Sequence, residues 1–199
     1  MRKVLFMKGS ELRLIEYMEG SKKRFIIPVY QRNYDWKIEN CKQLYDDLIQ
    51  VIKNNSKTHF FGSIVSVYEP SGRNTEFLII DGQQRLTTMS LLFLALYNLL
   101  EEKIIISEDE SLKDQIYEDF LVDKYQPQEK RMKLKPIKND QKAFSKLFNS
   151  KDDYIKDSNL TINYSYFYER IQKQEITIDE LFDAICRLEI INITLNNED

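Results

Sequence analysis

One long apolar segment, residues 86–100, constrains the fold of this chain more than any other feature. It reads Leu-Thr-Thr-Met-Ser-Leu-Leu-Phe-Leu-Ala-Leu-Tyr-Asn-Leu-Leu and is apolar on nearly every side. A segment of this length is too long for a strand, so it predicts a helix buried in the protein core. The shorter apolar run Phe77–Ile80 comes just before it and predicts a buried strand. The chain must therefore bury a strand and the helix that closely follows it.

Five polar or conformationally free residues join these two elements: Asp81-Gly82-Gln83-Gln84-Arg85. A helix N-terminus presents unpaired N–H groups and the positive end of the helix dipole, which together suit an anion. Gly82 can adopt a positive φ, and Arg85 adds a planar fork that matches a phosphate. Asp81 could hold a hydrated Mg²⁺ or orient Arg85. The plainer interpretation is a tight turn in which Asp81 caps the helix and Arg85 is solvated.

The sequence Asp81–Thr88 resembles the DGQQR box of the N-terminal domain of GmrSD-type, modification-dependent restriction endonucleases. Two upstream segments, Ile27–Trp36 and Phe60–Val65, resemble other parts of that family and occur in the same order. The resemblance is strong from residue 10 to residue 100. Beyond it, the resemblance rests on Arg131–Pro136 with Asp140, and on Asn163-Tyr164.

The resemblance implies an α+β fold related to the ParB/sulfiredoxin-like proteins. We expect a small mixed β-sheet core with the DGQQR box at a strand-to-helix junction in residues 1–106. Residues 107–199 are expected to form a mainly helical extension that completes the domain. Because the chain stops straight after a predicted strand, we expect it to be a fragment of a longer protein. The C-terminal nuclease domain of the family would then lie outside it.

The resemblance also implies that a nucleoside triphosphate with Mg²⁺ is either bound or hydrolysed at the junction. Gln31 and Arg32 would face Gln84 and Arg85 across one cleft, and an amide can orient an attacking water. The residues expected to take part in catalysis are Asp81, Gln84 and Arg85, with Asp81 also the candidate Mg²⁺ ligand. The residues expected to bind the nucleotide are Tyr30, Gln31, Arg32, Gly62, Ser63, Gly82, Gln83, Thr87 and Thr88.

The function implied is an NTP-binding or NTP-hydrolysing regulatory domain of a DNA restriction system that serves phage defence. Its partners would be DNA carrying modified bases and a C-terminal nuclease domain or subunit, and an oligomer is compatible with this role. One alternative is a non-catalytic DNA-binding module that holds the backbone of DNA in the same cleft. Another is a ParB-like nuclease that acts alone.

Composition excludes several other classes of protein. The net charge is −3, although residues 1–37 carry nine Lys/Arg against four Asp/Glu and could form a basic face. His59 is the single histidine, which excludes a multi-histidine metal site within the chain. Cys41 and Cys186 lack metal-ligand spacing and are expected to be reduced thiols, with Cys186 in the core. No apolar run reaches membrane length, so we expect a soluble cytoplasmic protein without a membrane partner.

Hydrophobic spacing predicts the remaining elements. The helices are expected at Ser10–Gly20, Ile38–Lys53, Leu112–Leu121, Asp140–Phe148, Tyr164–Gln172 and Ile178–Cys186. The strands are expected at Phe25–Ile27, Phe60–Tyr68, Met132–Leu134 and Leu188–Leu195, with a hairpin turn at Pro70–Asn74 and a charged loop at Ser150–Asn159.

Overall fold

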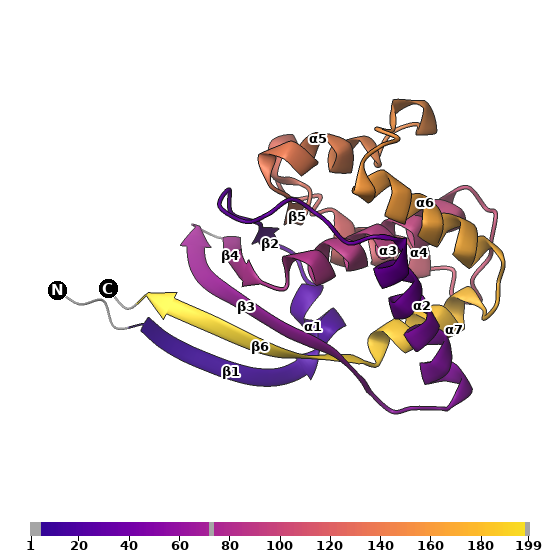
Figure 1. Cartoon of the computed structure of the whole chain (residues 1–199), viewed down its shortest axis with the longest axis horizontal. Helices are drawn as coiled ribbons and strands as arrows, with labels where there is room; N and C mark the ends of the chain where they lie inside the picture. The colour runs from indigo at the N-terminus through magenta and orange to yellow at the C-terminus, as the bar shows by residue number, and fades with distance from the viewer. Residues whose placement is uncertain (1–4, 72–73, 198–199) are drawn as a thin grey trace.

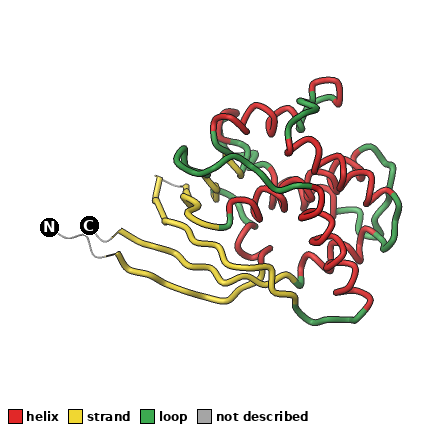
Figure 2. The backbone as a smooth tube through the Cα atoms, viewed as in Figure 1, coloured by secondary structure: helices red, strands yellow, loops and turns green. Residues whose placement is uncertain are grey.

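The computed structural model describes residues 5–71 and 74–197 and combines a six-stranded mixed sheet with a layer of helices (Figures 1 and 2). The strand order is β1-β6-β3-β4-β2-β5. The expected α+β class, with a small mixed sheet and a helix at the DGQQR junction, is confirmed. The strands are β1 Leu5–Arg13, β2 Lys23–Ile26, β3 His59–Ser71, β4 Asn74–Asp81, β5 Leu134–Lys135 and β6 Leu188–Asn197.

The helices pack around α3, the apolar helix predicted from residues 86–100 (Figure 1). All of its side chains from Leu86 to Leu96 are buried, as expected for a core helix. The ring of Phe93 stacks on Phe120 with a centroid distance of 4.3 Å, which ties α3 to the segment after α4. The helices are α1 Leu14–Met18, α2 Ile38–Lys53, α3 Gln83–Glu101, α4 Leu112–Ile116, α5 Lys138–Lys146, α6 Asn159–Gln172 and α7 Ile178–Cys186.

The last strand, β6, lies inside the sheet rather than at its edge. It pairs antiparallel with β1 and parallel with β3, so the N-terminal strand and the β3–β4 hairpin meet only through it. The short strand β5 adds the opposite edge by pairing parallel with β2. Residues 107–199 therefore supply two strands of the sheet in addition to α4, α5, α6 and α7.

The helix expected from Ser10 to Gly20 is wrong in its first half. Ser10 lies in β1, which pairs with β6 along its whole length from Leu5↔Asn197 to Arg13↔Glu189. Only Leu14–Met18 is helical. The local pattern after Ser10 suits an amphipathic helix, but pairing with a strand almost two hundred residues away along the chain overrides it.

Other elements differ from expectation mainly at their ends. The predicted bounds of α2 and α7 match the structure, whereas β5 and α5 are displaced by two residues or less at their starts. The helix α6 begins five residues before Tyr164 because the side chain of Ser158 caps it, accepting a hydrogen bond from Leu160 N at 3.3 Å. The helix after Ser111 ends in a π-helical turn, residues 117–121. In the expected hairpin turn, Gly72 and Arg73 lie outside the described residues. Of the two cysteines, Cys186 is half-buried and not fully in the core as expected, whereas Cys41 is fully buried.

The buried amine of Lys133 predicts a pH dependence of stability. This side chain is 1 % exposed, and its Nζ donates hydrogen bonds to the backbone carbonyls of Gly20 (2.6 Å) and Asp119. Burial lowers the pKa of Lys133 from 10.5 to about 8. Between these values the unfolded chain binds the proton more tightly, so the contribution of Lys133 to the free energy of unfolding should rise with pH.

Denaturant melts of the wild type and of Lys133→Met from neutral pH to pH 10 would measure this effect. Subtracting the two curves removes the titration of other groups, including the tyrosines. We expect the wild type to gain stability relative to the variant across this range. Parallel curves would show that Lys133 keeps its ordinary pKa in the folded protein.

Candidate functional site

The DGQQR box forms the joint between β4 and α3, and its geometry depends on a glycine. Gly82 is the N-cap residue directly before α3, with φ +93°, and no side chain caps the helix there. A Cβ at this position would lie 3.0 Å from Ile64 Cγ1 and 3.1 Å from the carbonyl oxygen of Ser63. The interpretation that Asp81 caps the helix is therefore wrong, and the N–H groups of the first turn lack a side-chain acceptor from the cap.

The guanidinium of Arg85 lies against the backbone of β3. Its Nη2 donates to the carbonyl oxygen of Ser63 at 2.5 Å and to Asp81 Oδ2 at 3.4 Å. A Cβ at Gly62, which has φ +127°, would lie 3.0 Å from Arg85 Nε, so the glycine makes room for this side chain. The Nε is buried and has no hydrogen-bond partner among the described residues. Arg85 is thus held at the start of α3 with part of its donor capacity unused.

Gln31 connects the loop after β2 to this joint. Its Nε2 donates to the carbonyl oxygen of Ile80 at 2.8 Å, and its Oε1 accepts from Gln83 Nε2 at 3.1 Å. The loop and the joint line a pocket of about 240 Å³ that is open to solvent. Its lining residues are Gln31, Arg32, Trp36, Ile80, Asp81, Gly82, Gln83, Gln84 and Arg85. The structure therefore brings Gln31 and Arg32 to the same pocket as the DGQQR box.

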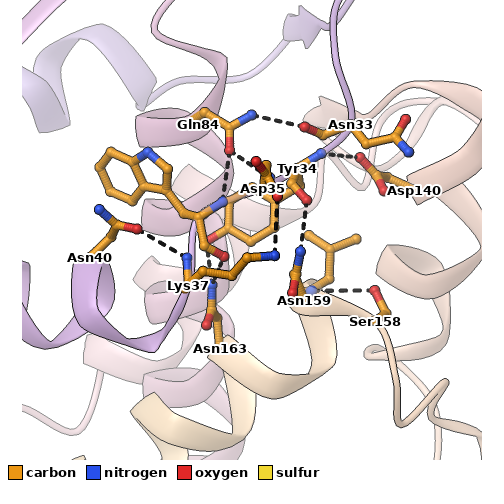
Figure 3. A network of polar contacts seen from close by, with 12 residues as sticks. Asn33, Tyr34, Asp35, Lys37, Asn40, Gln84, Asp140, Ser158, Asn159 and Asn163 are labelled. Carbon is orange, nitrogen blue, oxygen red and sulfur yellow. Dashed lines mark hydrogen bonds and ion pairs between the residues drawn. The ribbon is translucent and has the colours of Figure 1, made fainter.

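The amide of Gln84 is occupied at both ends by the loop (Figure 3). Its Oε1 accepts from the backbone N–H groups of Asp35 (2.8 Å) and Trp36 (3.1 Å). Its Nε2 donates to the carbonyl oxygen of Asn33 at 3.1 Å. The side chain is 6 % exposed. These hydrogen bonds fix the loop 33–36 against the start of α3.

Tyr34 fastens the same loop to the core of the helical layer. Its hydroxyl lies 2.7 Å from Thr88 Oγ1 and accepts from Asn163 Nδ2 at 2.9 Å, and burial raises the pKa of this phenol. The backbone N–H of Tyr34 donates to Asp140 Oδ2 at 2.6 Å, and burial raises the pKa of that carboxyl. Asn163 Nδ2 also donates to the carbonyl oxygen of Trp36 at 2.8 Å. Asp140 on α5 and Asn163 on α6 thus hold this loop in place (Figure 3). Both residues lie in the part of the chain where the resemblance to the family is weaker.

Several expected nucleotide-binding residues lie away from the lining of the pocket. Thr88 is fully buried beside Tyr34, and Thr87 is 2 % exposed in the core face of α3. Tyr30 is 69 % exposed, at the turn that follows β2. Gly62 and Ser63 contact Arg85 through their backbone. The side chain of Arg85 packs closely on Gly62, and the carbonyl oxygen of Ser63 accepts a hydrogen bond from it. Sequence reasoning missed Asn159, whose Nδ2 donates to the carbonyl oxygen of Tyr34 at 3.3 Å; its position in a charged segment gave no signal.

The chemistry of the pocket suits an anion that brings its own cation. Among its lining residues Arg32 and Arg85 are cationic, and Asp81 supplies the single carboxylate. No group of three or more metal-binding side chains occurs in residues 5–71 and 74–197. One carboxylate fits Mg²⁺, which is commonly held by one or two carboxylates together with substrate phosphates. The residues present therefore fit a magnesium-bound phosphate compound better than a metal bound by protein alone.

Comparison with known proteins identifies the family. None of the helices in the described part of the chain is long and apolar enough to cross a membrane. A search of curated proteins gives no match. The family model described as "GmrSD restriction endonuclease, N-terminal domain" matches residues 14–199, which include every residue of the pocket. The chain therefore belongs to the N-terminal domain family of the GmrSD restriction endonucleases.

Proposed function

We propose that this chain is the nucleoside-triphosphate-binding and -hydrolysing regulatory domain of a modification-dependent DNA restriction endonuclease. The observation that carries the proposal is Arg85, whose Nη2 is fixed on Ser63 and Asp81 at an uncapped helix start that lines the pocket. A helix start of this kind and a guanidinium both favour phosphate oxygens. The pocket they line is small and polar, which suits the phosphate end of a nucleotide.

Each lining residue has a separate part in this proposal. Arg32 and Arg85 bind phosphate oxygens, and Asp81 either holds Mg²⁺ or keeps Arg85 in place. Bound Mg²⁺ would neutralise phosphate charge as it does in other nucleotide sites. Gln83 has an amide oxygen free to accept from a nucleotide or a water, since only its Nε2 is bonded to Gln31. Gln84 acts through the loop 33–36, because both ends of its amide are already bonded there.

Membership of the family supports the biological setting of this proposal. A restriction endonuclease acts on DNA, so nucleotide binding at this domain would regulate cleavage by a C-terminal nuclease domain or subunit in the cytoplasm. We further propose that the system serves phage defence and acts on DNA with modified bases. Tyr30 is exposed on the loop after β2, next to the pocket residue Gln31, and would stack on a base.

Calorimetric titration of each nucleoside triphosphate with Mg²⁺ into the chain tests the proposal. We expect one nucleotide to bind and Arg85→Ala to weaken it about tenfold to hundredfold, since one charge-assisted contact contributes about 1.5–3 kcal/mol. Arg85→Lys keeps the positive charge but loses the planar guanidinium, so its nucleotide affinity should lie between those of the wild type and Arg85→Ala.

Lys53→Ala is the matched control, because it removes one positive charge from the exposed far end of α2. This variant should bind as the wild type does. The absence of binding heat with every nucleotide, or equal affinity for Arg85→Ala and the wild type, would overturn the proposal. DNA that competes with the bound nucleotide would instead favour a cleft that holds the DNA backbone.

A further inference from the structure

Residues 130–146 form one of two basic stretches in a chain whose net charge is negative, and the other stretch is residues 1–37. Residues 130–146 contain seven Lys/Arg and a single acidic residue, Asp140, although the whole chain has a net charge of −3. Asp140 does not offset these charges at the surface, because its carboxylate turns inward to the backbone N–H of Tyr34. The net charge of residues 130–146 is +6, so the other residues sum to −9, and the chain has no general basic coat.

We call four of these lysines the α5 stripe: Lys138, Lys142 and Lys146 on α5, and Lys135 on β5, three residues before the helix. The first three are spaced four residues apart on α5 and so lie on one face of the helix. Ala143 and Phe144 on the opposite face are buried in the core. From Lys138 to Lys146 the stripe extends about 12 Å along the helix axis, at 1.5 Å per residue. Lys135, Lys138 and Lys142 are exposed, and Lys146 is half-buried.

The lysines of the α5 stripe have no acidic partner in the described part of the chain, a property shared by isolated lysines such as Lys53 and Lys173, whereas five other lysines are paired. Lys37, Lys42, Lys113, Lys124 and Lys151 each lie within 4 Å of a carboxylate. No ion pair within the described ranges includes a lysine of the α5 stripe. A row of ordinary solubilising charges usually alternates with acids. Three unpaired cations on one helix face, with Lys135 close by in the chain, instead suit the regularly spaced phosphates of a nucleic-acid strand.

The α5 stripe is also joined to the loop that borders the candidate nucleotide pocket. The carbonyl oxygen of Lys135 accepts from Ile27 N at 2.9 Å, directly before the loop begins. Asn139 Nδ2 lies 3.5 Å from Asn33 Oδ1, and Asp140 binds Tyr34 N. Figure 1 shows this loop passing beside α5 on its way from β2 to α2. The turn of the loop carries Val29 and Tyr30, which are 87 % and 69 % exposed.

From these contacts we infer that the α5 stripe is the surface on which this domain holds the phosphate backbone of duplex DNA. The inference deepens the role in DNA restriction proposed above and rests on it. It places DNA outside the pocket of the DGQQR box, so nucleotide and DNA can be bound together. The loop 28–36 then touches both sites, since α5 holds one side of it and Gln84 holds the other.

The test is binding of a short, fluorescently labelled, unmodified DNA duplex to the chain over a series of salt concentrations. The logarithm of the affinity should fall steeply with the logarithm of the salt concentration. The variant K135Q/K138Q/K142Q should bind more weakly at every salt concentration. The magnitude of its slope should fall by about 2.7, because each phosphate that a lysine no longer neutralises accounts for about 0.9 of the slope.

The matched control is K53Q/K57Q/K173Q, which removes the same charge from exposed lysines at or just beyond the far ends of α2 and α6. It should keep the slope of the wild type. Equal slopes for the two triple variants, or no DNA binding by the wild type at low salt, would overturn the inference. Calorimetry with nucleotide separates this outcome from failure of the proposed function, because K135Q/K138Q/K142Q should bind nucleotide as the wild type does.

Discussion

Gly82→Ala should lower the free energy of unfolding by about 3 kcal/mol, because two separate costs add at this position. The first cost is backbone strain, since φ is +93° and an L side chain rarely adopts that conformation. The second is overpacking, because the new Cβ would lie 3.0 Å from Ile64 Cγ1 and close to the backbone of Ser63. Displacing Ser63 would also move the acceptor of Arg85, so nucleotide affinity should fall as well. Chemical denaturation and nucleotide calorimetry measure the two effects.

Two other glycines divide the effect into its parts. Gly20 has φ +102° but open space around the added Cβ, so Gly20→Ala measures strain without overpacking. Gly9 in β1 has neither constraint, and Gly9→Ala should leave stability unchanged or raise it by up to about 1 kcal/mol. If Gly82→Ala costs no more than Gly20→Ala, the contact with Ile64 relaxes freely and the joint is not tightly packed.

Gln84→Ala should destabilise the fold by about 2–4 kcal/mol, because it removes three hydrogen bonds and leaves backbone groups of the loop without partners. The loop 33–36 would remain attached through Tyr34, whose contacts with Thr88 and Asn163 do not involve Gln84. We therefore expect a folded protein with lower stability and weaker nucleotide binding. Thermal melts and calorimetry of the same samples give both values.

Gln84→Glu is the informative comparison. Glutamate keeps two acceptor positions for the N–H groups of Asp35 and Trp36 but cannot donate to Asn33. Its stability should lie between those of the wild type and Gln84→Ala. A different result, with stability and nucleotide affinity unchanged in Gln84→Ala while hydrolysis is abolished, would make Gln84 a catalytic residue as the sequence resemblance implies.

The sequence predicts well those elements that local periodicity determines. The bounds of α2 are those expected from its apolar spacing, and the β3–β4 hairpin leads into α3 as the junction requires. Local periodicity fails where a distant partner decides, as in residues 10–13, which pair with β6. The position of β6 inside the sheet has no local signal either, because strand order depends on contacts between the two ends of the chain.

The sequence predicts part of the pocket lining, although five of the expected residues lie outside it, and it does not predict the direction of the side chains. The motif groups Gln31, Arg32 and the DGQQR box, and the structure places all of them around one pocket. The sequence cannot show that Gln84 turns to the loop while Arg85 turns to Ser63, because both outcomes suit a polar residue at a helix start. Thr88 also suits a polar site by its residue type, but its hydroxyl lies in the core and is bonded to the buried Tyr34.

The central place of β6 has a consequence for how this chain folds as it is made. During synthesis from the N-terminus, β1 cannot find its partner until residues 188–197 have left the ribosome. The first strand therefore waits with its backbone groups unpaired until β6 has been made, and the contacts between β1 and β6 have a very large sequence separation. We expect a slow, late step of folding in which the two ends of the chain are joined, and this step would be the period in which a nascent molecule is most open to chaperones.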